Sequence, residues 1–351
     1  MRSPRSAGRA ALLVGAAGAL LLVLLDALVR DEPRPEDDDL IYERMADDPS
    51  APHTYVFAFR VAVPWLVHVL PFSHDVSFAA LAWIFSGAAG AVLFLLLDRL
   101  EASRTVSIPL AIALVVSPPL LVASLRQGRN PDPLTVLVMV TGALFIVERR
   151  PVPLGITMLV GAFNRESALF LAPLAYAVWA DDVLDPRALR TVALAAAPAV
   201  VAFVTLRLAI PTVGRQQIPG YGGSLLGGRA DVVDEALEEP FTQLRRLFAV
   251  YGPLWLVAPF ALAGMRFARR GTVLVALCAL ACTFALDWGR ILFIAAPVVY
   301  TASAWVLDRR PAWRAPVFAL LAALVVGYAI YMQADGVQNL IDAGPPPYPV
   351  R

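Results

Sequence analysis

The chain has 351 residues, of which 59% are hydrophobic and only 16% are charged. A soluble domain carries about 25% charged residues, so this composition excludes a protein that faces water on all sides and predicts a membrane protein. The formal net charge of +1 comes without a basic domain that could bind nucleic acid, and we expect no such partner. The two cysteines, Cys278 and Cys282, lie four residues apart in an apolar segment and predict neither a disulfide framework nor a zinc site.

The first apolar segment runs from Ala10 to Val29 and is long enough to span a bilayer. It exceeds the apolar region of a usual signal peptide, and no A-x-A cleavage site precedes Arg30, so we expect a retained first span. Three arginines, Arg2, Arg5 and Arg9, precede this segment. They predict a cytoplasmic N-terminus in the plasma membrane and an extracytoplasmic loop after the first span.

This first outer loop, residues 30–75, is strongly acidic. Nine of the 28 acidic residues of the chain fall between Asp31 and Asp48. The apolar stretch from Tyr55 to Pro71 is near the lower length limit for a span and contains Arg60 and Pro64. If it crossed the membrane, the arginine-rich loops at 266–270 and 309–310 would lie outside, against the positive-inside rule. The stretch therefore predicts an interfacial or re-entrant helix on the outer face.

Further apolar segments fill the rest of the chain, which we interpret as one transmembrane domain over residues 1–351. The predicted spans after the first are residues 76–97, 105–125, 134–147, 191–210, 250–265, 272–286, 291–307 and 315–332, and residues 152–180 supply two more. That last block is too long for one ordinary helix and carries Asn164-Arg165-Glu166 in its middle, which predicts two short helices with the triplet at their outer tip. The predicted fold is an all-α, polytopic bundle of about eleven transmembrane helices.

A second long outer loop is predicted over residues 211–249. Six glycines in its first half predict a mobile segment, which could be a lid over a ligand or a plain connector. Apolar residues in its second half share one helical stripe: Val233, Leu237, Phe241, Leu244 and Phe248. This stripe predicts a helix on the membrane surface, and Pro240 could divide it in two.

Polar residues of the predicted outer face gather in four places, whereas the cytoplasmic loops are short and mostly basic. The four places are Asp37 to Tyr42 with Arg60, residues 126–132, Asn164-Arg165-Glu166, and Asp287-Trp288-Gly289-Arg290. The working surface is therefore predicted to face the extracytoplasmic side. Nucleotide-activated substrates are absent from that side. A donor used on that face has to be anchored in the membrane or delivered through it.

In these features the sequence resembles the polytopic glycosyltransferases of the GT-C type, in particular small bacterial members. The resemblance is carried by Asp37-Asp38-Asp39 and Tyr42, the segment Phe57 to Pro64, Asp132-Pro133 opening a span, Arg165-Glu166 between short helices, and Asp287 to Arg290 before a late span. It implies a polyprenyl-phosphate sugar donor, a glycan or lipid acceptor of the cell envelope, and an inverting transfer. It also implies that an acidic residue of the first outer loop acts as the base.

The chemistry assigns roles to these residues. Inverting transfer to a hydroxyl needs one carboxylate as general base, and Asp39 is the first candidate because it lies nearest to Leu40-Ile41-Tyr42, with Asp38 and Asp37 next. The leaving phosphate needs guanidinium groups to stabilise its charge. The predicted substrate-binding residues are Tyr42, Arg60, Asp132, Arg165, Glu166, Asp287 and Arg290, and the three arginines among them would contact the phosphate.

Other interpretations of the same residues stay open. The acidic run could be a solvated loop, or Asp37 and Asp39 could hold a divalent cation such as Mg²⁺ or Mn²⁺. Two neighbouring pairs, Arg165 with Glu166 and Asp287 with Arg290, could be structural ion pairs. The whole chain could also be a transporter or flippase of a lipid-linked substrate, or a non-catalytic membrane partner subunit. A transporter would leave the sugar–phosphate bond intact, whereas a transferase breaks it. A non-catalytic subunit would keep its function when the carboxylates of the outer loop are neutralised.

Overall fold

The computed structural model describes residues 4–29, 37–54, 57–125, 129–213, 240–284 and 288–335. These residues are helical apart from turns, loops and one parallel pair of two-residue strands, β1 His53–Thr54 and β2 Thr212–Val213. The strand pair joins the first outer loop to the segment that opens the second. The predicted all-α class is confirmed for the described part of the chain.

Five helical segments are long and apolar enough to cross a membrane. They are Ser6–Leu28 in α1 (Pro4–Val29), α4 (His74–Arg99), Arg104–Leu125, α10 (Pro186–Ala209), and Pro311–Ile330, which includes most of α17 (Arg314–Asp335). The third segment contains two helices, α5 (Arg104–Val115) and α6 (Pro118–Leu125), because Pro118 interrupts the regular helix. These segments support the prediction of a polytopic membrane protein.

The other predicted spans coincide with shorter helices. These are α7 (Asp132–Val147), α8 (Pro151–Ala162), η2 (Glu166–Phe170), α9 (Leu171–Trp179), α13 (Leu254–Val257), η3 (Ala258–Ala263), α14 (Arg266–Ala281), η4 (Cys282–Phe284), α15 (Trp288–Phe293) and α16 (Ala296–Arg309). The short helix η5 (Pro311–Trp313) opens the fifth candidate segment, and most of α12 (Pro240–Tyr251) belongs to the second outer loop. The segment from α12 through η3 bends by 80° and forms a sixth candidate only if both arms count as one span. The predicted number of about eleven spans is therefore not confirmed.

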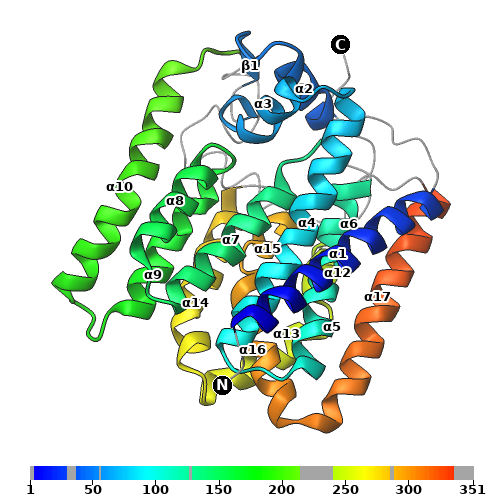
Figure 1. Ribbon diagram of the computed structural model, residues 1–351, viewed down its shortest axis with the longest axis vertical. Helices are drawn as coiled ribbons and strands as arrows, with labels where there is room; N and C mark the ends of the chain where they lie inside the picture. The colour runs from blue at the N-terminus through cyan, green and yellow to red at the C-terminus, as the bar shows by residue number, and fades with distance from the viewer. Residues whose placement is uncertain are drawn as a thin grey trace.

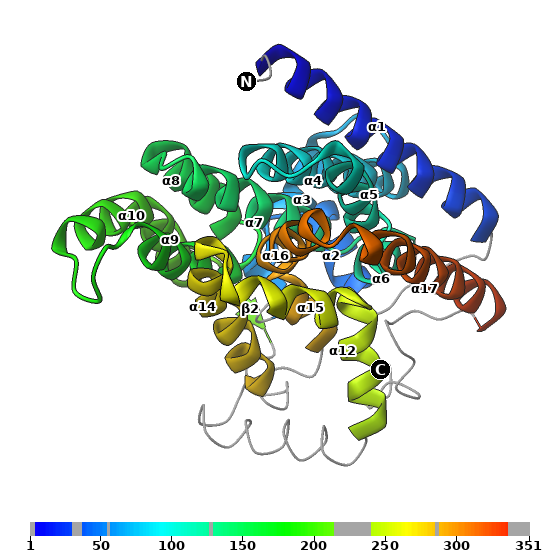
Figure 2. The same ribbon diagram turned by 90° about the horizontal axis from the view of Figure 1, so that it is seen from below.

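The first outer loop forms a cap at one end of the bundle, where α2 (Asp37–Asp47), η1 (Phe57–Phe59) and α3 (Ala62–Val69) lie together (Figure 1). The stretch predicted to form an interfacial or re-entrant helix contains α3, which has only eight residues. From the cap, α4 runs to the opposite end of the bundle, and α10 lies at one side, packed mainly against α8. On the other side α1 and α17 flank α5 and approach each other near their C-terminal ends (Figures 1 and 2).

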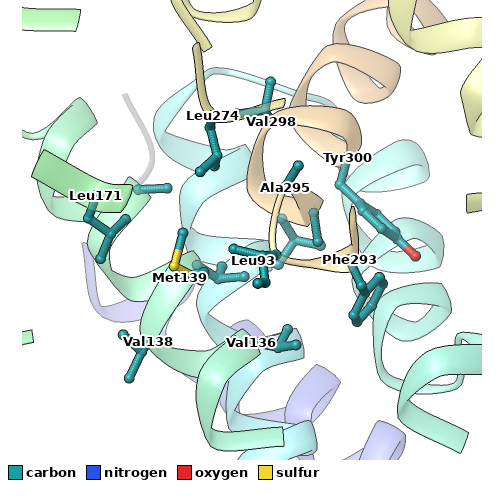
Figure 3. Packing of buried hydrophobic residues seen from close by; sticks show 14 of the residues in the cluster. Leu93, Val136, Val138, Met139, Leu171, Leu274, Phe293, Ala295, Val298 and Tyr300 are labelled. Atoms are coloured by element: carbon teal, nitrogen blue, oxygen red, sulfur yellow. The ribbon is translucent and has the colours of Figure 1, made fainter. Parts of the chain in front are cut away.

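The core lies where α4, α7, α9, α14 and α16 meet. Side chains from these helices, among them Leu93, Met139, Leu171, Leu274 and Val298, point toward one another and are buried (Figure 3). Inside a membrane, such contacts stabilise helix pairs mainly through close van der Waals packing, which small residues permit. These buried contacts hold the N-terminal ends of α7 and α15 next to the cap.

The predicted break inside residues 152–180 is confirmed. The helix α8 ends at Ala162, and η2 begins at Glu166, so Asn164 and Arg165 lie in the turn between them. In the second outer loop the described helix α12 begins at Pro240, a residue suited to the first position of a helix because it has no N–H to satisfy. The glycine-rich segment and the residues Val233 and Leu237 lie outside the described residues.

Candidate functional site

A buried cluster of one carboxylate and two guanidinium groups forms where three chain segments meet. Asp132, the first residue of α7, accepts hydrogen bonds from Arg165 Nη1 through Oδ1 and from Arg290 Nε through Oδ2. The three side chains are only 11–12% exposed. Arg165 comes from the turn after α8 and Arg290 from α15, so the fold brings together residues up to 158 positions apart.

The backbone around Asp132 is held by two asparagines. Asn130 Oδ1 accepts the N–H of Asp132 at 3.0 Å. Asn164, which is fully buried, donates through Nδ2 to the carbonyl of Pro131 at 3.0 Å and to Thr135 Oγ1 at 2.9 Å. Because Asn164 directly precedes Arg165, one turn fixes both the carboxylate and the guanidinium that binds it. The sequence placed Asn164 at this outer tip, but its bonding partners could not be predicted.

The electrostatics of the cluster keep Asp132 ionised. Burial alone would raise the pKa of this carboxyl, but the guanidinium groups of Arg165 and Arg290 outweigh that effect and hold the pKa at about 2. Both carboxylate oxygens of Asp132 are occupied by these two partners. Asp132 is therefore suited to holding the two arginines in place and is a poor base at neutral pH.

Arg60 adds a third buried guanidinium. Arg60 directly follows η1 and is 6% exposed. Its guanidinium group lies over the ring of Phe57, 5.1 Å from the ring centre, and donates a hydrogen bond through Nη1 to Tyr42 Oη at 2.8 Å. It forms no ion pair with any described carboxylate, and its Nε has no hydrogen-bond partner among the described residues. A buried cation without a contacting counter-ion is costly unless an anion can be bound there.

The predicted pairing of Arg165 with Glu166 is not present, because Arg165 turns to Asp132. Glu166 Oε2 instead lies 3.9 Å from Arg207 Nη2. Arg207 belongs to the last turn of α10 and stacks on Phe203 at 3.7 Å and on Phe59 at 4.7 Å. Arg207 was not among the residues predicted for the site. Its position at the predicted outer end of an apolar span was the signal that could have drawn attention to it.

The acidic helix α2 is anchored on two sides. Tyr42 is fully buried against Arg60, and the next residue, Glu43, lies 3.1 Å from Arg129 Nη1. Arg129 also bonds Asp75, at the start of α4, at 2.8 Å. Its position three residues before Asp132 links α2 to the chain segment that carries the buried cluster.

Two histidines secure the other end of α2. A ring nitrogen of His68 lies 2.7 Å from the carbonyl of Ala46, and one of His53 lies 2.9 Å from the carbonyl of Asp48. These contacts with backbone carbonyls give His68 and His53 a structural role that requires no metal ion. Among the described residues no group of three or more His, Cys, Asp or Glu side chains could hold a metal ion.

The three aspartates Asp37, Asp38 and Asp39 form the first turn of α2, but their side chains lie outside the described part of the structure. By helical register, Asp39 shares a face of α2 with Tyr42 and Glu43, three and four positions later. Positions 37 and 39 do not share a face, so the register does not support a cation held by both. Asp287 also lies outside the described residues, and its predicted partner Arg290 pairs with Asp132.

Comparison with known proteins gives a likeness of fold. No protein-family model matches the chain, and no curated protein matches it in sequence. The fold is similar to the crystal structure of the Archaeoglobus fulgidus oligosaccharyltransferase in complex with Zn and sulfate, with a TM-score of 0.50 and 16% sequence identity over 95% of this chain and 54% of that one. The chain thus spans about half the length of that structure. At this level of sequence identity the likeness is one of fold alone.

Proposed function

We propose that the protein is a membrane glycosyltransferase that transfers a sugar from a polyprenyl-phosphate donor to an acceptor hydroxyl on the extracytoplasmic face. The observation that carries the proposal is the cluster at the cap end of a GT-C-like fold, where Arg165 and Arg290 are held on Asp132 and Arg60 is buried nearby. Among the described residues, the carboxylates that act on these three guanidinium groups are Asp132 and Glu166. Arg207 lies beside Glu166, so the described charges of the site remain net positive. An anionic group of the substrate would supply the balance.

The arginines suit the leaving group of this reaction. As the glycosidic bond to phosphate breaks, negative charge develops on the phosphate oxygens, and fixed N–H donors stabilise it most in a buried site. Guanidinium groups can offer two parallel donors to a phosphate. Arg165 and Arg290 are already oriented by Asp132, so binding the phosphate costs little further ordering.

The base in this proposal is Asp39. Its carboxylate takes the proton of the acceptor hydroxyl while the hydroxyl oxygen forms a bond to the anomeric carbon. The bond from that carbon to the phosphate oxygen breaks, and its electron pair leaves with the phosphate, which inverts the anomeric centre. Asp39 is preferred to Asp132 because both oxygens of Asp132 are bonded to arginines, and to Asp37 because position 39 shares the face of Tyr42.

The test is release of polyprenyl phosphate from a panel of labelled polyprenyl-phosphate sugars by wild type, Asp39→Asn and the matched control Asp48→Asn in nanodiscs. The proposal predicts turnover that Asp39→Asn lowers by about 10²- to 10⁴-fold, the usual contribution of a general base, and that Asp48→Asn preserves. Equal turnover in all three proteins refutes the role of Asp39. An intact donor that moves between leaflets supports a transporter, and no effect on any donor supports a partner subunit.

A further inference from the structure

An apolar hollow lies between α12 and α17, away from the buried cluster. It has a volume of about 570 Å³ and is lined mainly by Phe241, Leu244, Arg245, Phe248, Gly327 and Tyr328. A second apolar hollow of about 480 Å³ lies among α1, α5 and α17, and Leu324 lines both. Neither hollow shares a lining residue with the small pocket at Asp132, Arg165 and Arg290. The α17 residues that line the first hollow, from Ala323 to Tyr328, belong to the middle and later turns of that helix.

The described side chains leave this hollow open. Phe241, Leu244 and Phe248 are 80%, 59% and 52% exposed, although they lie on the apolar stripe of α12. A Cβ atom added at Gly327 would meet no atom within 4 Å. Most glycines of the described helices differ, because an added Cβ would meet a neighbouring atom closer than 3 Å. The described residues therefore leave space on this face of α17.

One cation stands at the hollow. Arg245 lines it, is exposed, and forms no ion pair or hydrogen bond with another described residue. It lies on α12, most of which belongs to the second outer loop, and Tyr328 lies toward the C-terminal end of the candidate span in α17. An arginine and a tyrosine at the end of an apolar hollow match a lipid with its acyl chain inside and its phosphate at the membrane surface.

We propose that this hollow binds an anionic phospholipid, with the phosphate at Arg245 and an acyl chain along α17 past Gly327. A second copy of the chain or a soluble protein fits less well, because the hollow opens beside a candidate span and so faces lipid. The donor of the proposed reaction is a separate ligand, since its phosphate belongs at Arg165 and Arg290. The lipid site does not depend on the catalytic assignment and would persist if that assignment failed.

The experiment measures binding of dioleoylphosphatidylglycerol and dioleoylphosphatidylcholine to the full chain in detergent, by native mass spectrometry and by the shift in Tm. Two variants address the hollow: Arg245→Gln removes the charge, and Gly327→Leu fills the space. Their matched controls are Arg190→Gln, an exposed arginine at the start of α10, and Gly8→Leu, where an added Cβ also meets nothing.

The wild type should bind the phosphatidylglycerol in preference to the phosphatidylcholine and gain Tm from it. Arg245→Gln should weaken that binding about fivefold, the effect of one arginine near an anionic lipid surface, and Gly327→Leu should abolish the bound species while Tm without lipid is kept. Both controls should behave as wild type.

Equal binding of the two lipids, or unchanged binding in both hollow variants, overturns the proposal. Displacement by polyprenyl phosphate would assign the hollow to the donor, and a change of oligomeric state in Gly327→Leu would assign it to a second copy.

Discussion

At the scale of single residues, the site depends on Asp132. It is the acidic member of the buried cluster, and each of its oxygens holds one arginine. Removing one partner of a buried ion pair leaves an uncompensated charge, which costs far more than the pair contributes. The four side chains Asp132, Arg165, Arg290 and Arg60 should therefore respond to mutation together, and their effects should not add.

We predict that Asp132→Asn destabilises the protein by about 3–5 kcal/mol, because two buried guanidinium groups lose their shared counter-ion. The measurement is the free energy of unfolding in mixed detergent micelles. Asp48→Asn serves as the control, since Asp48 is exposed and its carboxylate accepts hydrogen bonds from Ser50 in the same turn. A variant at position 132 as stable as the control would contradict the ion cluster.

The pH dependence of this difference follows from the lowered pKa of Asp132. Its ordinary value of 3.8 falls to about 2 in the folded chain, so its contribution is present above about pH 4 and is lost as the pH falls toward 2. The gap in stability between wild type and Asp132→Asn should stay constant from pH 8 to pH 5 and narrow only below about pH 4. A gap that closes near neutral pH would mean that Asp132 is protonated in the folded state.

At the scale of elements, close helix packing depends on a pair of glycines. A Cβ atom at Gly87 of α4 would lie 2.7 Å from the carbonyl oxygen of Gly15 in α1, and the reverse contact is equally short. We predict that Gly87→Val forces α1 away from α4 and lowers Tm by several degrees, because the backbone cannot yield as a side chain can. Gly8→Val, in open space on α1, should leave Tm nearly unchanged. Equal Tm values for both variants would show that α1 does not pack here.

The sequence predicted elements better than contacts. The break at Asn164-Arg165 was predictable because charged residues in the middle of an apolar block cannot face lipid, and the start of α12 because proline favours that position. The role of Arg207 and the hydrogen bonds of Asn164 could not be predicted, because the local sequence does not show which loops lie next to each other in the folded chain. The contact of Arg290 with Asp132, 158 positions away, shows the same limit.

At the scale of the whole molecule, the cap of α2 and α3 and the turn between α9 and α10 lie at opposite ends of the bundle (Figure 1). With the native cysteines replaced, we predict that Ser50→Cys reacts with an impermeant maleimide on intact cells. Val183→Cys, at an 88% exposed position in the other turn, should react only after permeabilisation. The reverse pattern would place the N-terminus outside and move the proposed site to the cytoplasmic face.

The measurement that tests the central claim most directly is the Kd of polyprenyl phosphate for purified wild type and Arg290→Gln, with Arg310→Gln as a control at an exposed arginine of the opposite end. Loss of one hydrogen-bonded charge at the phosphate should weaken binding about 10- to 150-fold. The Arg310→Gln control should bind as tightly as the wild type, and the Tm of each variant shows whether it is folded. Unchanged affinity in a folded Arg290→Gln protein would contradict the claim that the cluster around Asp132 binds the donor phosphate.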